Sequence, residues 1–489
     1  MFAYTQTEPW NSAEDCWETA AAIRAVSENP LHPDHPMLAV PGHLSPRFTP
    51  YTVIWGSVMR AFGWDILTVM KLSAWLNFAL FVTGLFRFAQ SLNARKLFAP
   101  LLLLVMFICW GNGYTQSNAY HFWFFFYTLP HIAAPSFGLG FHALAELINF
   151  LATRARHSLA LFVLLFSLVF LIHPITGLFV FVTAFALSVT EGNARRAVPA
   201  LLAPIAAFAA LLWWPYFDYP KVLFTGTKDT WYVTEMYSGQ LRALGIALAG
   251  IPIAGYFLLK RKHAFEVIGL TLFSAGYLLS YALDIAIGER SLLFAVFFLH
   301  LCIALFVYEA ICDRLDRSSS DHVSKKVRLG LCAVILISAL AYRQHDVRMT
   351  GSLLISSTIS RRHPQTLPER FGFLSQNISS RDLLMTDPYG GWILHALTGA
   401  KAVSHMHGNP LMTEDLTQRE ADAWRFMTGD LTLTERKVML RQYGVTHILL
   451  DLTKPARYSP QLLRDMNEIA NSVVVERDSV QLYRVLEHF

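Results

Sequence analysis

Residues 291–311, Ser-Leu-Leu-Phe-Ala-Val-Phe-Phe-Leu-His-Leu-Cys-Ile-Ala-Leu-Phe-Val-Tyr-Glu-Ala-Ile, form an almost unbroken apolar stretch directly after Arg290. A transmembrane helix needs about 20 predominantly apolar residues to cross the hydrocarbon core of a bilayer. Further segments of the chain share this composition, although 97–112 and 158–172 are short and need flanking residues to complete a crossing. The ten predicted spans are residues 67–90, 97–112, 133–153, 158–172, 176–190, 197–214, 241–259, 264–284, 291–311 and 327–342.

The composition agrees with a multi-pass α-helical membrane protein. Of the 489 residues, 54% are hydrophobic and only 15% are charged, which leaves room for one modest soluble domain. The net charge of +5 is explained by basic loops between the spans, so it gives no support to nucleic-acid binding. The cysteines form no Cys-x-x-Cys or Cys/His cluster of the kind that binds zinc.

Basic residues are unevenly divided between alternate connections. One set of connections contains only Lys221, Lys228 and Arg290. By the positive-inside rule the richer set is cytoplasmic, so both termini are predicted to be extracytoplasmic. The richer set holds Arg87, Arg95, Lys96, Arg154, Arg156, Arg195, Arg196, Lys260, Arg261, Lys262, Arg314, Arg317, Lys325, Lys326 and Arg328.

This topology predicts three parts: an acidic N-terminal segment (1–66), a transmembrane domain (67–342) and an extracytoplasmic C-terminal domain (343–489). Residues 1–66 contain no basic region followed by an apolar core, so no signal peptide is seen. We therefore expect an upstream span to be missing from this chain, or else a natural protein whose N-terminus lies outside.

Within the N-terminal segment, Asn11 or Ser12 is expected to cap a helix that ends near Glu28. A proline- and histidine-rich stretch follows, and residues 51–63 are expected to form an interfacial or re-entrant helix. The outer connection 215–240 is expected to fold over a cavity as a lid.

Strand and helix patterns alternate in the C-terminal part, which predicts a small α/β domain beginning near residue 365. The expected strands are residues 381–387, 400–404, 445–451 and 472–475, and the expected helices are residues 390–398, 413–428, 433–443 and 460–470.

The acidic residues Glu14, Asp15 and Glu18 are the first candidates for chemistry. At helical spacing Glu14 and Glu18 share one face, and Asp15 is displaced by about 100°. A carboxylate at Asp15 has the chemistry to take a proton from an attacking hydroxyl. The simpler interpretation is that all three acids lie on a solvated helix start.

Arg290 lies at the predicted outer mouth of span 291–311, where a guanidinium suits a phosphate; alternatively it pairs with Glu289 or Asp284. Of the outer histidines, His43 and His173 are the better candidates for a metal or phosphate site, although a histidine in a turn is more often structural. The ionisable residues Lys71, Glu146 and Asp284 are expected to face the bundle interior because they are costly in lipid.

In plan, the chain resembles the GT-C superfamily of polyprenyl-phosphate-sugar-dependent glycosyltransferases, which includes protein O-mannosyltransferases and aminoarabinose transferases. The matching features are the acidic first loop with Glu14-Asp15, a surface helix after it, many spans, Arg290 at the outer end of a late span, and a C-terminal extracytoplasmic domain. The departure is the missing first span, which normally precedes the acidic loop.

The resemblance implies an inverting transferase with Asp15 as the catalytic base and Glu14 as the alternate. It implies that Arg290 holds the phosphate of a polyprenyl-phosphate sugar, and the outer polar residues His43, Arg47, His173 and Glu18 are candidates to assist in binding. A divalent cation is possible, the acceptor is a glycan, lipid or protein, and membrane lipids surround the spans. The expected location is a bacterial inner membrane with the active face outside.

Two other functions remain open from the sequence: a transporter or flippase of lipid-linked glycans, and a non-catalytic protein of envelope polysaccharide assembly. The α/β domain and the lack of evident internal repeats count against a transporter.

Overall fold

The computed structural model of the chain describes residues 14–40, 45–92, 97–111, 120–121, 125–126, 128–190, 202–218, 237, 239–315, 330–343, 367–388, 392–405, 415–453, 455–470, 475–477 and 479–486. The chain divides into two compact units. Unit 1 comprises residues 1–73, 214–227 and 361–489, and unit 2 comprises residues 74–213 and 228–360.

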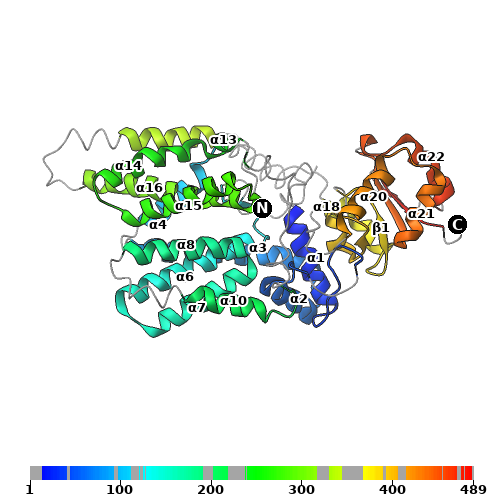
Figure 1. Cartoon of the computed structure of the whole chain (residues 1–489), viewed down its shortest axis with the longest axis horizontal. Coiled ribbons are helices and arrows are strands. Elements are labelled where there is room, and N and C mark those ends of the chain that lie inside the picture. The colour runs from blue at the N-terminus through cyan, green and yellow to red at the C-terminus, as the bar shows by residue number, and fades with distance from the viewer. Residues whose placement is uncertain are drawn as a thin grey trace, which may run out of the picture. The chain divides into compact units, whose positions relative to one another are not determined.

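Unit 2 is built from apolar helices (Figure 1). The first of them, α3, begins in unit 1 and continues into unit 2. They are α3 (Ile66–Leu92), α4 (Phe98–Ile108), α6 (Ala133–Thr153), α7 (Arg156–Ile172), α8 (Pro174–Thr190), α10 (Ala203–Leu212), α13 (Gln240–Leu244), η2 (Gly245–Ala249), α14 (Gly250–Leu259), α15 (Ala264–Ala282), η3 (Ala286–Glu289), α16 (Arg290–Leu315) and the helix Gly330–Arg343.

Each of the ten predicted spans contains helix in its described residues, but the helices differ in length, and residues 197–201 and 327–329 of two spans lie outside the described residues. Within the described residues, four are long and apolar enough to cross a membrane: Ile66–Leu92, Arg242–Leu259, Ala264–Ala282 and Arg290–Cys312. The other apolar helices include several of 10–17 residues, shorter than the roughly 20 residues that a crossing needs. These apolar helices indicate a multi-pass membrane protein.

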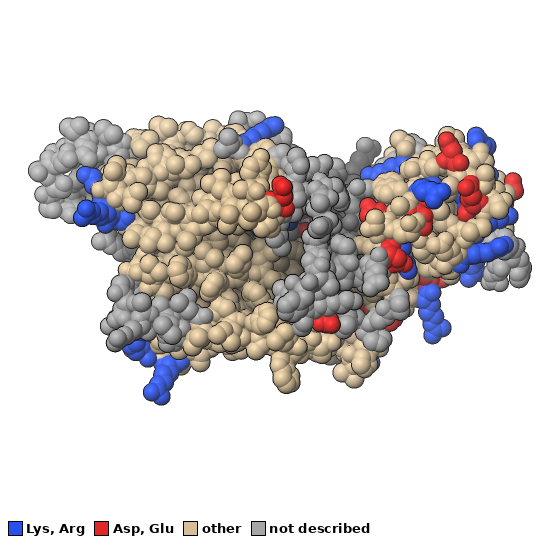
Figure 2. All heavy atoms as spheres, viewed as in Figure 1, with Lys and Arg blue, Asp and Glu red and all other residues tan. Residues whose placement is uncertain are grey.

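Helix α16 is the most deeply buried of the four, because 94% of its apolar window lies inside the structure. A helix that is apolar on every side is expected at the centre of a bundle. The described surface of unit 2 in Figure 2 is almost free of charged side chains, and its blue Lys and Arg side chains lie towards its ends. Such a distribution suits a belt of lipid between two aqueous layers.

Helices α3 and α6 approach each other closely at two glycines. A Cβ atom added to Gly84 would lie 2.2 Å from the carbonyl oxygen of Gly138, and one added to Gly138 would lie 2.5 Å from the carbonyl carbon of Leu80. Small residues allow helix backbones to pack closely in membranes. One turn from Gly84, Arg87 forms an ion pair with the buried Glu146 of α6.

The expectation that ionisable residues face the bundle interior holds for Glu146 and is wrong for Lys71 and Asp284. Both of these side chains are exposed. Asp284 lies beyond the last residue of α15, in a left-handed turn with a φ of 52°. Its carboxylate therefore lies outside the span that the sequence pattern assigned to it.

Unit 1 combines two N-terminal helices with the C-terminal α/β region. The helices are α1 (Glu14–Glu28) and α2 (Pro50–Phe62), and α1 packs on α2. The C-terminal elements are α18 (Leu367–Phe371), η4 (Gly372–Gln376), β1 (Leu383–Met385), α19 (Trp392–Thr398), β2 (Lys401–Ala402), α20 (Leu416–Thr428), α21 (Leu433–Tyr443), β3 (His447–Asp451), η5 (Pro455–Arg457), α22 (Pro460–Ile469), β4 (Val475–Arg477) and β5 (Val480–Arg484).

Helix α2 has strong sequence signals at both ends. Thr49 and Thr52 form a capping box, Pro50 occupies the first helical position, and Gly63 ends the helix in a left-handed conformation. Ile54 and Phe62 on this helix are exposed. Such a surface suits the predicted interfacial helix, and its contact with a membrane stays a prediction.

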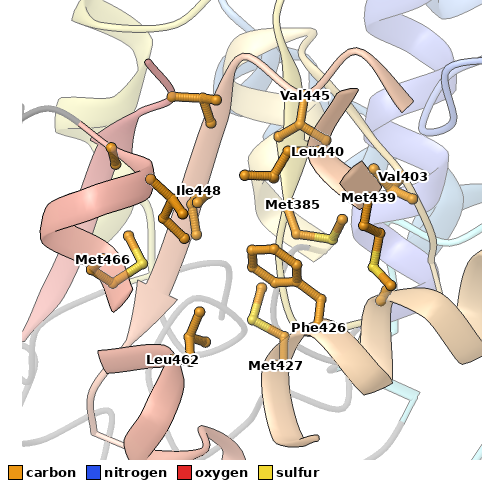
Figure 3. Packing of buried hydrophobic residues seen from close by; sticks show 14 of the residues in the cluster. Met385, Val403, Phe426, Met427, Met439, Leu440, Val445, Ile448, Leu462 and Met466 are labelled. Carbon is orange, nitrogen blue, oxygen red and sulfur yellow. The ribbon is translucent and has the colours of Figure 1, made fainter. Parts of the chain in front are cut away.

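The strand order in the sheet is β2-β1-β3-β5-β4. Strands β2, β1 and β3 are parallel, whereas β5 pairs antiparallel with both β3 and β4. The sequence predicted the regions of β1, β2 and β3 but not β5. The fourth expected strand, 472–475, meets β4 only at Val475, and residues 472–474 lie outside the described residues. Apolar residues of α20, α21 and α22 pack against the sheet, where Phe426, Met439 and Leu462 surround Met385 and Ile448 (Figure 3).

The N-terminal segment extends this sheet. Leu38 forms an isolated parallel bridge with Ala402 of β2, whose amide donates to the carbonyl of Met37 at 2.8 Å. The guanidinium of Arg419 donates to the carbonyl of Ala39 at 3.3 Å. Residues near the two ends of the chain thus belong to one compact unit, while the three-part division predicted from the sequence stays a prediction.

Candidate functional site

The acidic candidates lie at the start of α1, where the sequence predicted a helix. Asp15 is partly exposed, and Glu18 is 1% exposed. The side chain of Glu14 and the whole of His43 lie outside the described residues. The carbonyl of Asp15 accepts a hydrogen bond from the Thr19 hydroxyl at 3.0 Å. The three acids therefore do not share one solvated face, since Glu18 is buried.

Glu18 and Arg47 form an ion pair in which Oε2 lies 2.5 Å from Nη2. A buried carboxylate is costly unless an opposite charge accompanies it, and Arg47 supplies that charge. The structure thus brings together two residues that the sequence suggested separately. In this arrangement Arg47 anchors α1 to the turn before α2, and its role in phosphate binding stays a prediction.

Arg24 fixes α1 to the α/β part of unit 1. Its Nη1 donates to the carbonyl of Leu397 at 2.6 Å and to that of Ala396 at 3.3 Å, at the end of α19. Its Nε lies 2.9 Å from Glu28. A cation at the C-terminal end of a helix satisfies carbonyls that lack helical partners. Asp15 is therefore carried by a helix with defined contacts on both sides.

Three buried histidines in unit 1, His35, His395 and His405, lie near β2. The Nδ1 of His35 accepts hydrogen bonds from the amides of Met37 and Leu38 at 3.2 and 2.8 Å. The Nδ1 of His395 lies 2.7 Å from the carbonyl of Ala400 and donates to it, and its ring centroid lies 5.5 Å from that of His405. Sequence reasoning missed His395 and His405, because no pattern linked α19 to the segment after β2.

The electrostatics of this region favour neutral imidazoles. Burial, with Lys401, His395 and Arg47 nearby, lowers the pKa of His35 to about 3. Burial also lowers the pKa of His395 to about 4. Burial lowers the pKa of Lys401 to about 8, although Glu28 and Asp34 partly oppose it. His35 and His395 therefore act as uncharged hydrogen-bonding groups at neutral pH.

Arg290 and His173 belong to unit 2. Arg290 begins α16, is partly exposed, and has its Nε 3.8 Å from the buried Glu289, whose Oε1 accepts from Gln240 at 3.2 Å. The Nδ1 of His173 lies 2.7 Å from the Thr176 hydroxyl in the turn before α8. Their predicted roles in phosphate binding stay predictions.

Among the parts of the chain that the structure describes, no group of three or more His, Cys, Asp or Glu side chains is placed to hold a metal ion. Most of the predicted lid, residues 219–236 and 238, lies outside the described residues. Near its start, Tyr216 donates to the carbonyl of Pro30 at 2.7 Å, and Trp214, just before the predicted lid, donates to that of Phe48 at 2.7 Å.

Comparison with known proteins finds similarity to solved structures. No protein-family model and no curated protein matches the chain. Among solved structures, the chain is similar to an oligosaccharyltransferase of Archaeoglobus fulgidus that was tethered by a disulfide bond to an acceptor peptide containing the NVT sequon. The two are 12% identical with a TM-score of 0.48, and the match covers 96% of this chain and 70% of that one.

Proposed function

We propose that this protein is a membrane glycosyltransferase of the GT-C superfamily. It transfers a sugar from a polyprenyl-phosphate donor to an acceptor on the extracytoplasmic side, with inversion at the anomeric carbon. The apolar helices of unit 2 support a membrane enzyme whose donor is a lipid. The proposed location is a bacterial inner membrane, with the active face towards the periplasm.

The observation that carries this proposal is the difference between two acids of α1. Glu18 is buried against Arg47, whereas Asp15 is partly exposed at the start of the same helix. Glu18 is therefore suited to hold the helix in place, and Asp15 is suited to meet a substrate. Glu14 is the alternate base, because it begins the same helix.

The reaction follows from these roles. The acceptor hydroxyl attacks the anomeric carbon as its proton passes to the Asp15 carboxylate. The bond between the anomeric carbon and the phosphate oxygen breaks, and its electron pair leaves with the polyprenyl phosphate. Arg290 is proposed to stabilise the charge on the departing phosphate, and a preorganised cation in such a place typically contributes a few kcal/mol. His43 and His173 are proposed to assist in binding the phosphate.

Substitution of Asp15 tests the proposal. Membranes or reconstituted protein with Asp15→Asn should bind a polyprenyl-phosphate sugar but lose turnover by at least about 100-fold, because general-base catalysis contributes that much. Glu14→Gln tests the alternate base. Glu468→Gln, an exposed acid on α22, serves as the matched control and should retain full turnover.

Full turnover by Asp15→Asn would contradict the proposed base. Two results together would favour a transporter. Asp15→Asn would still move labelled lipid-linked glycan across vesicle membranes, and the unmodified protein would transfer no sugar. If the protein incorporates sugar into any acceptor and this incorporation depends on Asp15, a purely structural role is excluded.

A further inference from the structure

A buried carboxylate lies directly beside Arg290 at the start of α16. Glu289, the last residue of η3, is 0% exposed, whereas 18% of the Arg290 side chain is exposed. The Oε2 of Glu289 lies 3.8 Å from the Nε of Arg290. A buried carboxylate is costly unless an opposite charge or hydrogen bonds compensate it. The ion pair therefore has its anion buried in unit 2 and its cation partly exposed.

A second polar side chain holds this carboxylate from another helix. The Nε2 of Gln240, the first residue of α13, donates to the Oε1 of Glu289 at 3.2 Å. The two carboxylate oxygens thus have different neighbours, an amide at Oε1 and a guanidinium at Oε2. Because Gln240 holds Oε1, the other oxygen faces Arg290 in a defined direction.

The backbone that carries Glu289 is also closely packed. The hydroxyl of Tyr237 donates to the carbonyl of Ile285, just before η3, at 2.8 Å. A Cβ atom added to Gly288 would lie 2.0 Å from the Cβ of Ser280, so only glycine fits there without a shift. Burial, followed by the charge of Glu289, raises the pKa of Tyr237 to about 12, so its hydroxyl remains a donor at neutral pH. These contacts fix η3, and with it Glu289, against α15.

A fixed carboxylate matters here because an arginine side chain is flexible. Ordering such a side chain on a ligand costs conformational entropy, and a neighbour that holds it beforehand lowers that cost. A guanidinium is planar and carries five N–H donors, so a carboxylate that faces its Nε sets the direction of the whole group. Binding groups that their neighbours hold in place bind more strongly than loose ones.

We propose that Glu289, held by Gln240, is a positioning residue that orients the Arg290 guanidinium towards the phosphate of a lipid-linked donor. The inference rests on the proposed function, in which Arg290 contacts that phosphate. Glu289 acts through Arg290 and does not itself bind the phosphate, because two anions repel each other.

Binding of undecaprenyl phosphate to the purified full-length protein in nanodiscs tests the inference, with undecaprenol, which lacks the phosphate, as the comparison lipid. Glu289→Gln keeps the shape of the side chain and an oxygen that accepts from Gln240, but it loses the charge. It should weaken binding of undecaprenyl phosphate about three- to tenfold, the size of the coupling between residues of one ion-pair network. Its affinity for undecaprenol should not change, whereas a structural defect would weaken binding of both lipids.

Combination with Arg290→Gln shows whether Glu289 acts through Arg290. In protein that already carries Arg290→Gln, the further change Glu289→Gln should alter binding of undecaprenyl phosphate by less than about twofold. Gln240→Leu should weaken binding in the same direction, and it replaces Glu289→Gln as the test if that variant does not fold. Glu266→Gln, which changes another buried acid of unit 2, is the matched control and should bind as the unmodified protein does.

The inference is overturned if Glu289→Gln binds undecaprenyl phosphate as tightly as the unmodified protein, or more tightly. Parallel losses for undecaprenol, or the same loss with and without Arg290→Gln, would also overturn it. In each of these cases, binding by the unmodified protein that depends on Arg290 would leave the proposed function standing. If the unmodified protein does not bind undecaprenyl phosphate, both this inference and the proposed donor contact fail.

Discussion

The Oε2 of Glu18 lies 2.5 Å from Nη2 of Arg47, and this ion pair joins α1 to the turn that precedes α2. Only 1% of the Glu18 side chain is exposed, whereas 27% of the Arg47 side chain is. The pair is therefore asymmetric: loss of Arg47 leaves a carboxylate buried without its ion-pair partner, while loss of Glu18 leaves a cation that water reaches.

This asymmetry predicts that Arg47→Met destabilises the protein more than Glu18→Gln does. Removing one member of a buried pair costs about 3–5 kcal/mol, and the partial exposure of Arg47 reduces that figure here. Thermal unfolding of Arg47→Met, Glu18→Gln and the double variant should reveal the coupling free energy between the two side chains. Arg464→Met on the exposed face of α22 is the control, and equal losses for Arg47 and Arg464 would contradict the prediction.

The buried histidines predict an acid-sensitive unit 1. The pKa of His35 is lowered to about 3 in the folded protein. As the pH falls, His35 of the unfolded chain therefore binds a proton near the ordinary pKa of 6.5, while His35 of the folded chain stays neutral. Its contribution to stability is present above pH 6.5 and is lost as the pH falls towards 3. His35→Asn, which can still accept backbone hydrogen bonds, should show a shallower loss of melting temperature between pH 6.5 and 4.

The exposed neighbour His32 provides the comparison for that experiment. His32→Asn should follow the unmodified protein across the whole pH range. Identical slopes for His35→Asn and the unmodified protein would show that His35 does not govern the acid response.

The close crossing of α3 and α6 predicts a strong effect of one methyl group. Gly84→Ala places a Cβ atom 2.2 Å from the carbonyl oxygen of Gly138, and neither backbone can yield without separating the helices. Overpacking of this kind typically costs about 1–3 kcal/mol. Gly255→Ala in α14 is the matched control, because a Cβ atom there meets nothing within 4 Å. Resistance to unfolding in detergent should fall only for Gly84→Ala.

Substitution of Arg290 tests its proposed contact with the donor phosphate. Arg290→Gln should weaken donor binding or turnover by about 10- to 100-fold, the range expected for a lost charged hydrogen bond of 1.5–3 kcal/mol. Arg290→Lys should recover part of the loss through its charge alone. Arg242→Gln, another arginine near the start of a predicted span, is the control. Equal effects at both positions would contradict a specific role for Arg290.

Local patterns in the sequence were sufficient to locate most elements. Apolar runs gave the helices of unit 2, because a helix in lipid must satisfy its backbone internally and present apolar side chains outward. The start of α1 and the ends of α2 follow from capping and proline signals close in sequence. The same reasoning selected Asp15, Glu14 and Arg290 by their positions beside such elements.

Contacts between distant parts of the chain were decided only by the tertiary structure. The bond between Arg24 and Leu397 and the bridge between Leu38 and Ala402 join residues that no local pattern relates. Burial distinguishes Glu18 from Asp15, although both are acids of one helix turn, because it depends on what packs against each face. Among the described residues, the Ser404 hydroxyl and the Nε2 of His395 have no hydrogen-bond partner for the same reason, since a side chain acquires or lacks a partner only when the elements around it come together.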